Sequence, residues 1–486
     1  MPMTTLAKKQ PKDTAYYIKS AIGIFLMFGF GYLPPIAPLS HLGMQILGIF
    51  VGLIFLLCTV SIVWPSMLAV IALGMTEYCT VAEAVSSGFG SELVWMMLMM
   101  LILSEGMATS GMGEIIARWI ITRKFLNKRP FLFTFVFMWG MGICSLLVGS
   151  IVVVLMSWSI FYSIAEIVGY KKGERYSTMM IIGCFLSAIL FEGLLAFLNW
   201  LPAFCLTYQN MTGVGINYVT YFIIGFIVAT LMIFLSVLAM KFIFKCDFSK
   251  LNNIDVEALK SEGIGRLNFR HKFYLVCFGL IVAYVILTTV LPADFFLTVL
   301  LNTVTQTGWF TIVLVVAVVI RHEGKPVLDF AEIAKTGANW NILMMCASVI
   351  PVARALTSDG TGVTELINNL LSPIFGGMGP IMFIVTVMIA MMILTNIGSN
   401  MATSIIVVTV VLPFVSKYYF SPAIIGMAIL LIANLGFIFP GSSGMAPFLY
   451  SNKWIEVKDI YKYGLVYCVI FLIAAIPTFI VASYII

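Results

Sequence analysis

The sequence predicts an all-α polytopic membrane protein with about 11 transmembrane spans and two inverted-topology repeats, each with a re-entrant hairpin and a broken helix. Three observations lead to this fold class. Of the 486 residues, 61% are hydrophobic and only 10% are charged. Many apolar runs are about 20 residues long, the length with which a helix crosses a bilayer. Finally, motifs of the first half recur in the same order in the second half, which indicates an internal repeat.

The composition also limits what else the chain contains. The net charge of +6 is spread over short loops, so it reflects membrane topology and not nucleic-acid binding. The nine cysteines are scattered singly, without a CxxC or Cys/His pair, so neither a zinc-type site nor a disulfide framework is predicted. Walker, HExxH and GxSxG motifs do not occur in the sequence. We therefore expect no enzyme, no organic cofactor and no nucleic-acid partner.

The first half, 1–244, is expected to hold eight apolar segments and one amphipathic helix. The segment 112–130 is too charged to span and suits a helix lying on the cytoplasmic surface. The apolar stretch 176–204 is interrupted at Phe191-Glu192-Gly193, which predicts a broken helix. The remaining spans or hairpin arms are expected at 16–36, 43–63, 65–77, 88–106, 131–144, 151–168 and 218–244.

The stretch 245–272 is the one long polar linker and the predicted seam between two halves. Its Lys and Arg residues favour the cytoplasmic side, and the same bias favours a cytoplasmic N-terminus. In the second half, 273–486, a polar break is expected at 440–447. The apolar segments around it are expected at 273–291, 294–320, 338–356, 380–417, 421–439 and 463–486.

A polar stretch from Thr395 to Thr403 lies between two apolar runs. Lipid offers no hydrogen-bond partners, so non-helical backbone at membrane depth must be buried in protein or line a wet cavity. Gly398, Ser399 and Asn400 are therefore predicted to form the tip of a hairpin that enters the membrane and turns back. The alternative is an ordinary turn outside the membrane. Unwound carbonyl groups at such a tip can hold a cation, and helix N-termini can face an anion.

A related tip is expected in the first half. The residues 144–155 align without gaps on 398–409, so that Ser145 is paired with Ser399. No asparagine stands opposite Asn400, because the first half has a leucine there. The second half thus keeps polar groups that the first half lacks, and the binding chemistry is predicted to lie mainly in the C-terminal half.

The second part of the repeat contains the helix breaks. The stretch 191–198 aligns with 442–449, which places Glu192 in the first break and Ser442 and Ser443 in the second. An ionisable group inside a span is costly and suggests a function. We expect Glu192 to act as a proton carrier or as a fixed negative ligand to a cation. The alternative is a structural glutamate that faces an aqueous vestibule or pairs with Lys or Arg.

These motifs, in this order, resemble the divalent anion/sodium symporter (DASS) family of the ion-transporter superfamily. The family has a Ser-Asn-Thr motif at each hairpin tip. Here the second tip has Ser399-Asn400-Met401 with Thr403 close by, whereas the first has the degenerate Ser145-Leu146-Leu147. The stretches that carry the resemblance are GFGSELVW…GMATSGMG (88–113), ANWNIL…ALTSDGTG (338–362), LTNIGSNMAT (394–403) and FPGSSGMAP (439–447).

The resemblance implies an elevator-type secondary transporter of the plasma membrane that works as a homodimer. It would move a di- or tricarboxylate or sulfate together with Na⁺, at one site rather than two, or exchange one anion for another. Hydroxyl, amide and carbonyl oxygens are hard ligands that suit Na⁺. The substrate is then expected at Ser399, Asn400, Thr403, Ser145 and Gly444, and the cation at Gly398, Ser399, Asn400, Ser442, Ser443 and Gly444.

Other functions remain as alternatives. Glu192 favours a proton-coupled anion carrier or a Na⁺/H⁺ antiporter of the same superfamily. A membrane-embedded enzyme that acts on lipid would need clustered intramembrane Asp or His residues, which the sequence does not show. A channel would need rings of pore-lining residues from a symmetric assembly, and the internal repeat argues against it.

Overall fold

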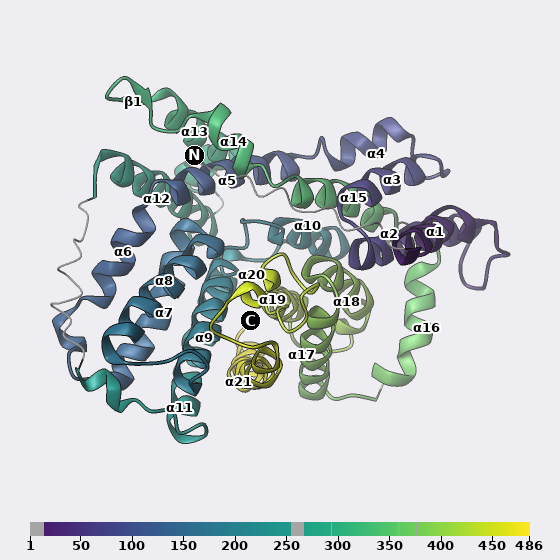
Figure 1. Ribbon diagram of the computed structural model, residues 1–486. Coiled ribbons are helices and arrows are strands. Elements are labelled where there is room, and N and C mark those ends of the chain that lie inside the picture. The colour runs from purple at the N-terminus through teal and green to yellow at the C-terminus, as the bar shows by residue number, and fades with distance from the viewer. Residues whose placement is uncertain (1–13, 254–266, 293, 357, 359, 376) are drawn as a thin grey trace.

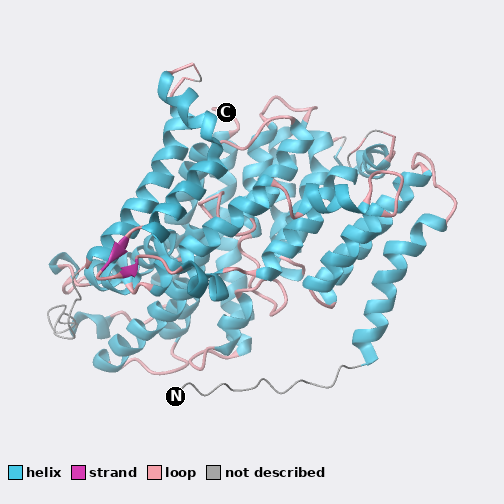
Figure 2. Ribbon diagram, turned by 90° about the horizontal axis from the view of Figure 1, so that it is seen from above, coloured by secondary structure: helices cyan, strands magenta, loops and turns pink. Residues whose placement is uncertain are grey.

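The computed structural model describes residues 14–253, 267–292, 294–356, 358, 360–375 and 377–486. Helices make up nearly all of the regular structure in these residues (Figure 2). Eleven of the helices are long and apolar enough to cross a membrane, or up to twelve if a bent pair counts as one span. The described chain is therefore an all-α polytopic membrane protein, as the sequence predicts.

The helices of the first half follow the expected order, with two differences. The expected span at 65–77 is a shorter apolar helix of 12 residues, and the charged segment after 112 forms only ten residues of helix. The helices are α1 (Thr14–Gly29), α2 (His41–Thr59), α3 (Val63–Gly74), α4 (Val81–Gly88), α5 (Glu92–Thr109), α6 (Met112–Ile121), α7 (Pro130–Val148), α8 (Ser150–Val168), α9 (Arg175–Glu192), α10 (Leu201–Thr212) and α11 (Tyr218–Phe242).

The second half adds ten helices and one short antiparallel hairpin of strands in the described residues. The strands are β1 (Arg321–His322) and β2 (Lys325–Pro326). The helices are α12 (Phe269–Val290), α13 (Phe296–Val319), α14 (Phe330–Gly337), α15 (Trp340–Leu356), α16 (Val363–Phe375), α17 (Pro380–Ile397), α18 (Asn400–Val415), α19 (Pro422–Ala433), α20 (Ala446–Ser451) and α21 (Val457–Ala482). The helices α14 and α15 form the bent pair, with 69° between them.

The same series of elements occurs once in each half. A helical hairpin, α7–α8 or α17–α18, is followed by a helix that stops inside the protein, α9 or α19, and then by a shorter helix, α10 or α20. Figure 1 shows α17 to α21 in the middle of the molecule, between α6–α9 on one side and α1–α4 with α16 on the other. The order of elements thus agrees with the predicted repeat.

The two interrupted helices, α9 and α19, are the most enclosed elements. Every residue of 176–191 and of 424–433 is buried. A helix that is apolar on all sides is stable only when it is surrounded by other apolar elements. The two halves also meet along α9: the Tyr467 hydroxyl of α21 donates to the Met179 carbonyl at 2.7 Å, and Phe185 lies against Phe437. The ends of α9 and α19 are therefore held at fixed positions inside the protein.

The predicted seam lies partly outside the described residues, which omit 254–266. Its first part is attached to the first half. The Lys250 ammonium contacts the Glu174 carboxylate at 2.9 Å, and the Tyr170 hydroxyl donates to the Asp247 carbonyl at 2.5 Å. The division of the chain into 1–244, 245–272 and 273–486 stays a prediction.

One glycine lets the first hairpin reverse its direction. Gly149 is the single residue between α7 and α8, with φ 80° and ψ 156°. Residues with a Cβ rarely adopt a positive φ, so this one-residue connection depends on glycine. The second hairpin uses two residues, Gly398 and Ser399, both with extended backbone.

We predict that Gly149→Ala destabilises the protein by about 1–3 kcal/mol, because alanine strains the backbone at this φ. The measurement is thermal unfolding of the purified protein in detergent, followed by tryptophan fluorescence. Gly279→Ala is the matched control, since Gly279 lies inside α12 with open space around it. Equal unfolding temperatures for the two variants would contradict the role of Gly149.

Candidate functional site

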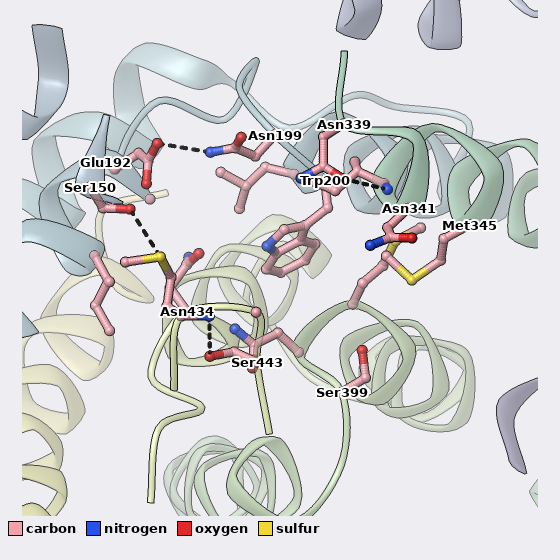
Figure 3. Close-up of a pocket in the computed structure, with 18 of the residues that line it drawn as sticks. Ser150, Glu192, Asn199, Trp200, Asn339, Asn341, Met345, Ser399, Asn434 and Ser443 are labelled. Carbon is pink, nitrogen blue, oxygen red and sulfur yellow. Dashed lines mark hydrogen bonds between the residues drawn. The ribbon is translucent and has the colours of Figure 1, made fainter. Parts of the chain in front are cut away.

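Both hairpin tips and both helix breaks line one cavity of about 280 Å³. This volume is near the lower end of the range for small-molecule sites, which is about 300–1,000 Å³. The bent pair α14–α15 also reaches the cavity through Asn339 and Asn341 (Figure 3). The polar lining residues are Ser150, Glu192, Asn199, Asn339, Asn341, Ser399, Asn400, Asn434 and Ser443.

The first-half wall is built around Glu192, the last residue of α9. Its Oε1 accepts a hydrogen bond from the Asn199 amide at 3.0 Å (Figure 3). Its carboxylate also lies close to Gly149 and to Ser150, the first residue of α8, whose hydroxyl donates to the Met445 sulfur at 3.8 Å. A carboxylate is favourable at a helix N-terminus, because the first N–H groups of a helix have no partner within the helix. Glu192 therefore lies beside the N-terminus of α8.

The break after α9 places Asn199 for this contact. Asn199 has φ 53°, a left-handed conformation that asparagine tolerates better than most residues. The Gly193 carbonyl, freed by the end of α9, accepts from the Tyr221 hydroxyl at 2.7 Å. An added Cβ on Gly193 would lie 2.6 Å from the Asn434 side chain, so the two breaks touch at this glycine.

The second-half wall is built around the N-terminus of α18. Ser399 is its N-cap residue, but no side-chain hydrogen bond caps the helix, and the Ser399 side chain lies at the cavity. The Asn400 backbone N–H donates to the Ser442 carbonyl at 3.3 Å, which joins the hairpin tip to the break after α19. Ser443 lies beside the cavity and its hydroxyl accepts from the Ala446 N–H at 3.1 Å.

Two buried residues at the end of α17 hold the second break in place. The Asn396 Oδ1 accepts from the backbone N–H groups of both Phe437 and Ile438 at 3.0 Å. The Thr395 hydroxyl lies 2.9 Å from the Ala433 carbonyl and 3.2 Å from the Asn400 Oδ1. Backbone groups freed by the break are thus satisfied by side chains of the hairpin, which is required inside an apolar environment.

The structure brings five of the predicted site residues to the cavity and keeps four away from it. Ser399, Asn400, Ser443, Gly444 and Glu192 line the cavity. The residues away from it are Gly398, Thr403, Ser442 and Ser145. Of these, Thr403 and Ser442 are buried supports of the second tip: the Thr403 hydroxyl donates to the Ser399 carbonyl at 2.6 Å, and the Ser442 hydroxyl donates to the Phe439 carbonyl at 2.7 Å.

The expected position of the first tip was wrong. Ser145 lies inside α7, fully buried, and its hydroxyl donates to the Gly142 carbonyl at 2.6 Å. The chain turns at Gly149, and the residue that reaches the cavity is Ser150. The gapless alignment placed the tip too early because runs of Ile, Val and Leu match in many registers.

Four lining residues escaped the sequence prediction. Ser150 was paired with a serine inside the second hairpin, and Asn339 and Asn341 belong to a motif that was used only for family resemblance. Asn434 follows an apolar helix, where asparagine is a common helix-end residue. Their shared signal is an amide or hydroxyl directly beside the end of an apolar run.

The charge of the cavity is unusual for an anion site. Among the described residues that line it, Glu192 is the one charged side chain, and Lys, Arg and His do not occur. Among the described residues no Lys or Arg is paired with Glu192, and its hydrogen-bond partner is the Asn199 amide. A carboxylate beside apolar protein needs a compensating proton, cation or donor group.

The second tip has ligands that fit Na⁺. Ser399, Asn400 and Ser443 line the cavity with hydroxyl and amide groups, and behind them the carbonyl of the buried Ser442 accepts from the Asn400 backbone N–H. Oxygen donors of this kind suit a hard cation, and the described residues contain no group of three or more His, Cys, Asp or Glu that could hold a transition metal.

We predict that Asn396→Ala destabilises the protein by about 2–4 kcal/mol, because two buried N–H groups lose their acceptor. Hydrogen exchange is expected to rise at Phe437 and Ile438 in particular. Asn210→Ala, an exposed position on α10, is the control. Unchanged exchange at the break would show that Asn396 does not hold it.

Comparisons with known proteins agree with this architecture. The model of the family described as "Sodium:sulfate symporter transmembrane region" matches residues 14–484. The fold is similar to that of MtrF from Neisseria gonorrhoeae, described with a class of antimetabolite efflux pumps: the TM-score is 0.59 at 15% identity, over 96% of this chain and 98% of that chain. At this identity the likeness shows the fold alone. Direct comparison with curated protein sequences gives no match. Because the family match covers nearly the whole chain, the protein belongs to the sodium:sulfate symporter (DASS) family of membrane transporters.

Proposed function

We propose that this protein is a secondary active transporter that moves a small organic anion across the cell membrane, coupled to Na⁺ or by exchange of anions. One observation carries the proposal: the two hairpin tips and the two helix breaks line a single cavity. Interrupted helices at a repeat interface are where transporters of this architecture bind substrate and coupling ions. Family membership supports the same reading.

In this proposal, the anion is bound beside the uncapped N-terminus of α18. The first turn of a helix presents N–H groups without partners in the helix and a partial positive charge, which favour a carboxylate or sulfate. In α18 the first of these groups, the Asn400 N–H, already donates to the Ser442 carbonyl, so the later N–H groups of the turn would bind the anion. The Asn400 side chain and the neighbouring amides of Asn341 and Asn434 supply further polar groups at the cavity. Di- and tricarboxylates and sulfate are the substrates to test first.

Na⁺ is placed at the second tip, among Ser399, Asn400, Ser443 and the Ser442 carbonyl. A cation there offsets part of the charge of the solute, which is needed because the cavity has no basic side chain among its described lining residues. On the basis of family membership, we also propose that the hairpins move together with the bound solute in an elevator mechanism. We propose that the protein forms a homodimer.

A second candidate function is a proton-coupled carrier or Na⁺/H⁺ antiporter. The observation in its favour is Glu192, the one charged side chain among the described cavity residues. In this case the carboxylate takes up a proton on one side of the membrane and releases it on the other. Because the fold is similar to that of an efflux pump, transport in the outward direction should be measured as well.

We predict Na⁺-dependent uptake of at least one labelled organic anion into proteoliposomes that contain the purified protein. An inward Na⁺ gradient and a pH gradient are imposed separately, in both directions, over a panel of succinate, malate, citrate, 2-oxoglutarate and sulfate. Asn400→Ala is expected to lower uptake by at least tenfold, since its amide lies at the tip. Asn210→Ala should retain wild-type uptake. The proposal fails if neither gradient nor counter-anion drives transport of any solute.

The role of Glu192 in coupling is measured in the same proteoliposomes. If the second candidate function holds, Glu192→Gln removes the response of transport to a pH gradient. If Na⁺ or exchange drives transport, the response to the Na⁺ gradient or counter-anion persists in this variant. A Glu192→Gln protein whose transport keeps the wild-type pH response would exclude the proton-carrier function.

A further inference from the structure

The charges in the cavity restrict the solute more than family membership does. An ionised Glu192 contributes one negative charge, and a single Na⁺ at the second tip balances it. A bound dicarboxylate would then leave two uncompensated negative charges in a cavity whose described lining contains no basic side chain. Uncompensated charge away from water is strongly unfavourable. A solute that brings its own positive group removes this imbalance.

Glu192 is positioned to receive such a group. Its side chain is half-buried and lies at the cavity, so it is open to a solute from one side. The Asn199 amide at 3.0 Å and the contacts to Ser150 hold the carboxylate from the protein side. Both neighbours are uncharged, so neither supplies a full positive charge to the carboxylate. The carboxylate therefore retains the capacity to pair with an ammonium group.

Between its two ends the cavity is lined by apolar side chains together with the amides of Asn339, Asn341 and Asn434. Figure 3 shows Glu192 and Ser399 well apart, with the Trp200 side chain between them. Trp200 is joined by three methionines, which adapt their shape to apolar or aromatic groups. These methionines are Met345, Met401 and Met445. The order from one end to the other is thus a carboxylate, an apolar surface and an uncapped helix N-terminus.

We propose that the transported solute is an amino-carboxylate, with its protonated amine against Glu192 and its carboxylate at the N-terminus of α18. This assignment rests on the proposed function and specifies its substrate class. The ammonium group donates hydrogen bonds to the Glu192 carboxylate, and the carboxylate of the solute accepts from the first turn of α18. With one Na⁺ and a zwitterionic solute, the net charge of the occupied cavity is zero.

The test uses pairs of compounds that differ by one amine. Alanine is paired with propionate, and phenylalanine with 3-phenylpropionate. Their dissociation constants are measured by calorimetry on the purified full-length protein in nanodiscs with Na⁺, for the wild type, Glu192→Gln and Glu166→Gln. Glu166 is exposed on α8, away from the cavity, and is the matched control.

In the wild type, the amine member of at least one pair is expected to bind tenfold or more tightly than its partner. Glu192→Gln should reduce this ratio to about one, while its binding of the compound without the amine persists and shows that the variant is folded. Glu166→Gln should keep the wild-type ratio.

The assignment is overturned by equal binding within both pairs in the wild type, or by a preference for the amine that survives in Glu192→Gln. A second outcome also overturns it: Glu192→Gln has the unfolding temperature of the wild type but binds none of the four compounds. Glu192 would then be needed for binding in general and not for recognition of the amine. If the wild type neither binds nor transports any of them, nor any anion of the uptake panel, the proposed function itself fails. Binding without amine preference leaves the proposed function intact.

Discussion

The architecture depends on satisfying backbone groups where helices stop inside apolar protein. The ends of α9 and α19 free N–H and C=O groups that neither lipid nor apolar side chains can pair. The Tyr221 hydroxyl donates a hydrogen bond to the backbone of the first break. Thr395 and Asn396 form hydrogen bonds with backbone groups of the second. Because Thr395 and Asn396 belong to the hairpin that leads to the cavity, the contacts that stabilise the second break also fix the position of its tip.

The two halves meet this constraint with different chemistry. In the second half, the backbone N–H of the tip donates to the carbonyl of Ser442, and the end of α18 stays open to the cavity. In the first half, Glu192 occupies the corresponding N-terminus of α8. The end of α8 therefore has a carboxylate beside it, whereas the end of α18 has none among the described residues. The pseudo-symmetry of the fold is kept, but the electrostatic symmetry is lost.

The sequence was sufficient for the fold class and the number of spans, because long apolar runs have few alternatives. It also identified Ser399, Asn400 and Glu192, since a polar group inside an apolar run is conspicuous. It did not locate the first tip, because the position of Ser150 depends on the turn at Gly149 and not on the aliphatic pattern around Ser145. Nor did it reveal that the Asn396 amide joins two segments about 40 residues apart in the chain, a contact that only folding creates.

The net charge of the occupied cavity also bears on the proposed movement of the hairpins. In the proposed elevator movement, a hairpin would carry its solute through apolar surroundings, where a net charge costs more free energy than the same groups in neutralising pairs. In a cavity with one fixed carboxylate, neutrality is reached only when the occupants together contribute one positive charge. Na⁺ alone satisfies this condition, and so does Na⁺ with a zwitterion, whereas a dianion with one Na⁺ does not. Under the proposed function, the carboxylate of Glu192 would thus decide which combinations of ion and solute leave the occupied cavity neutral.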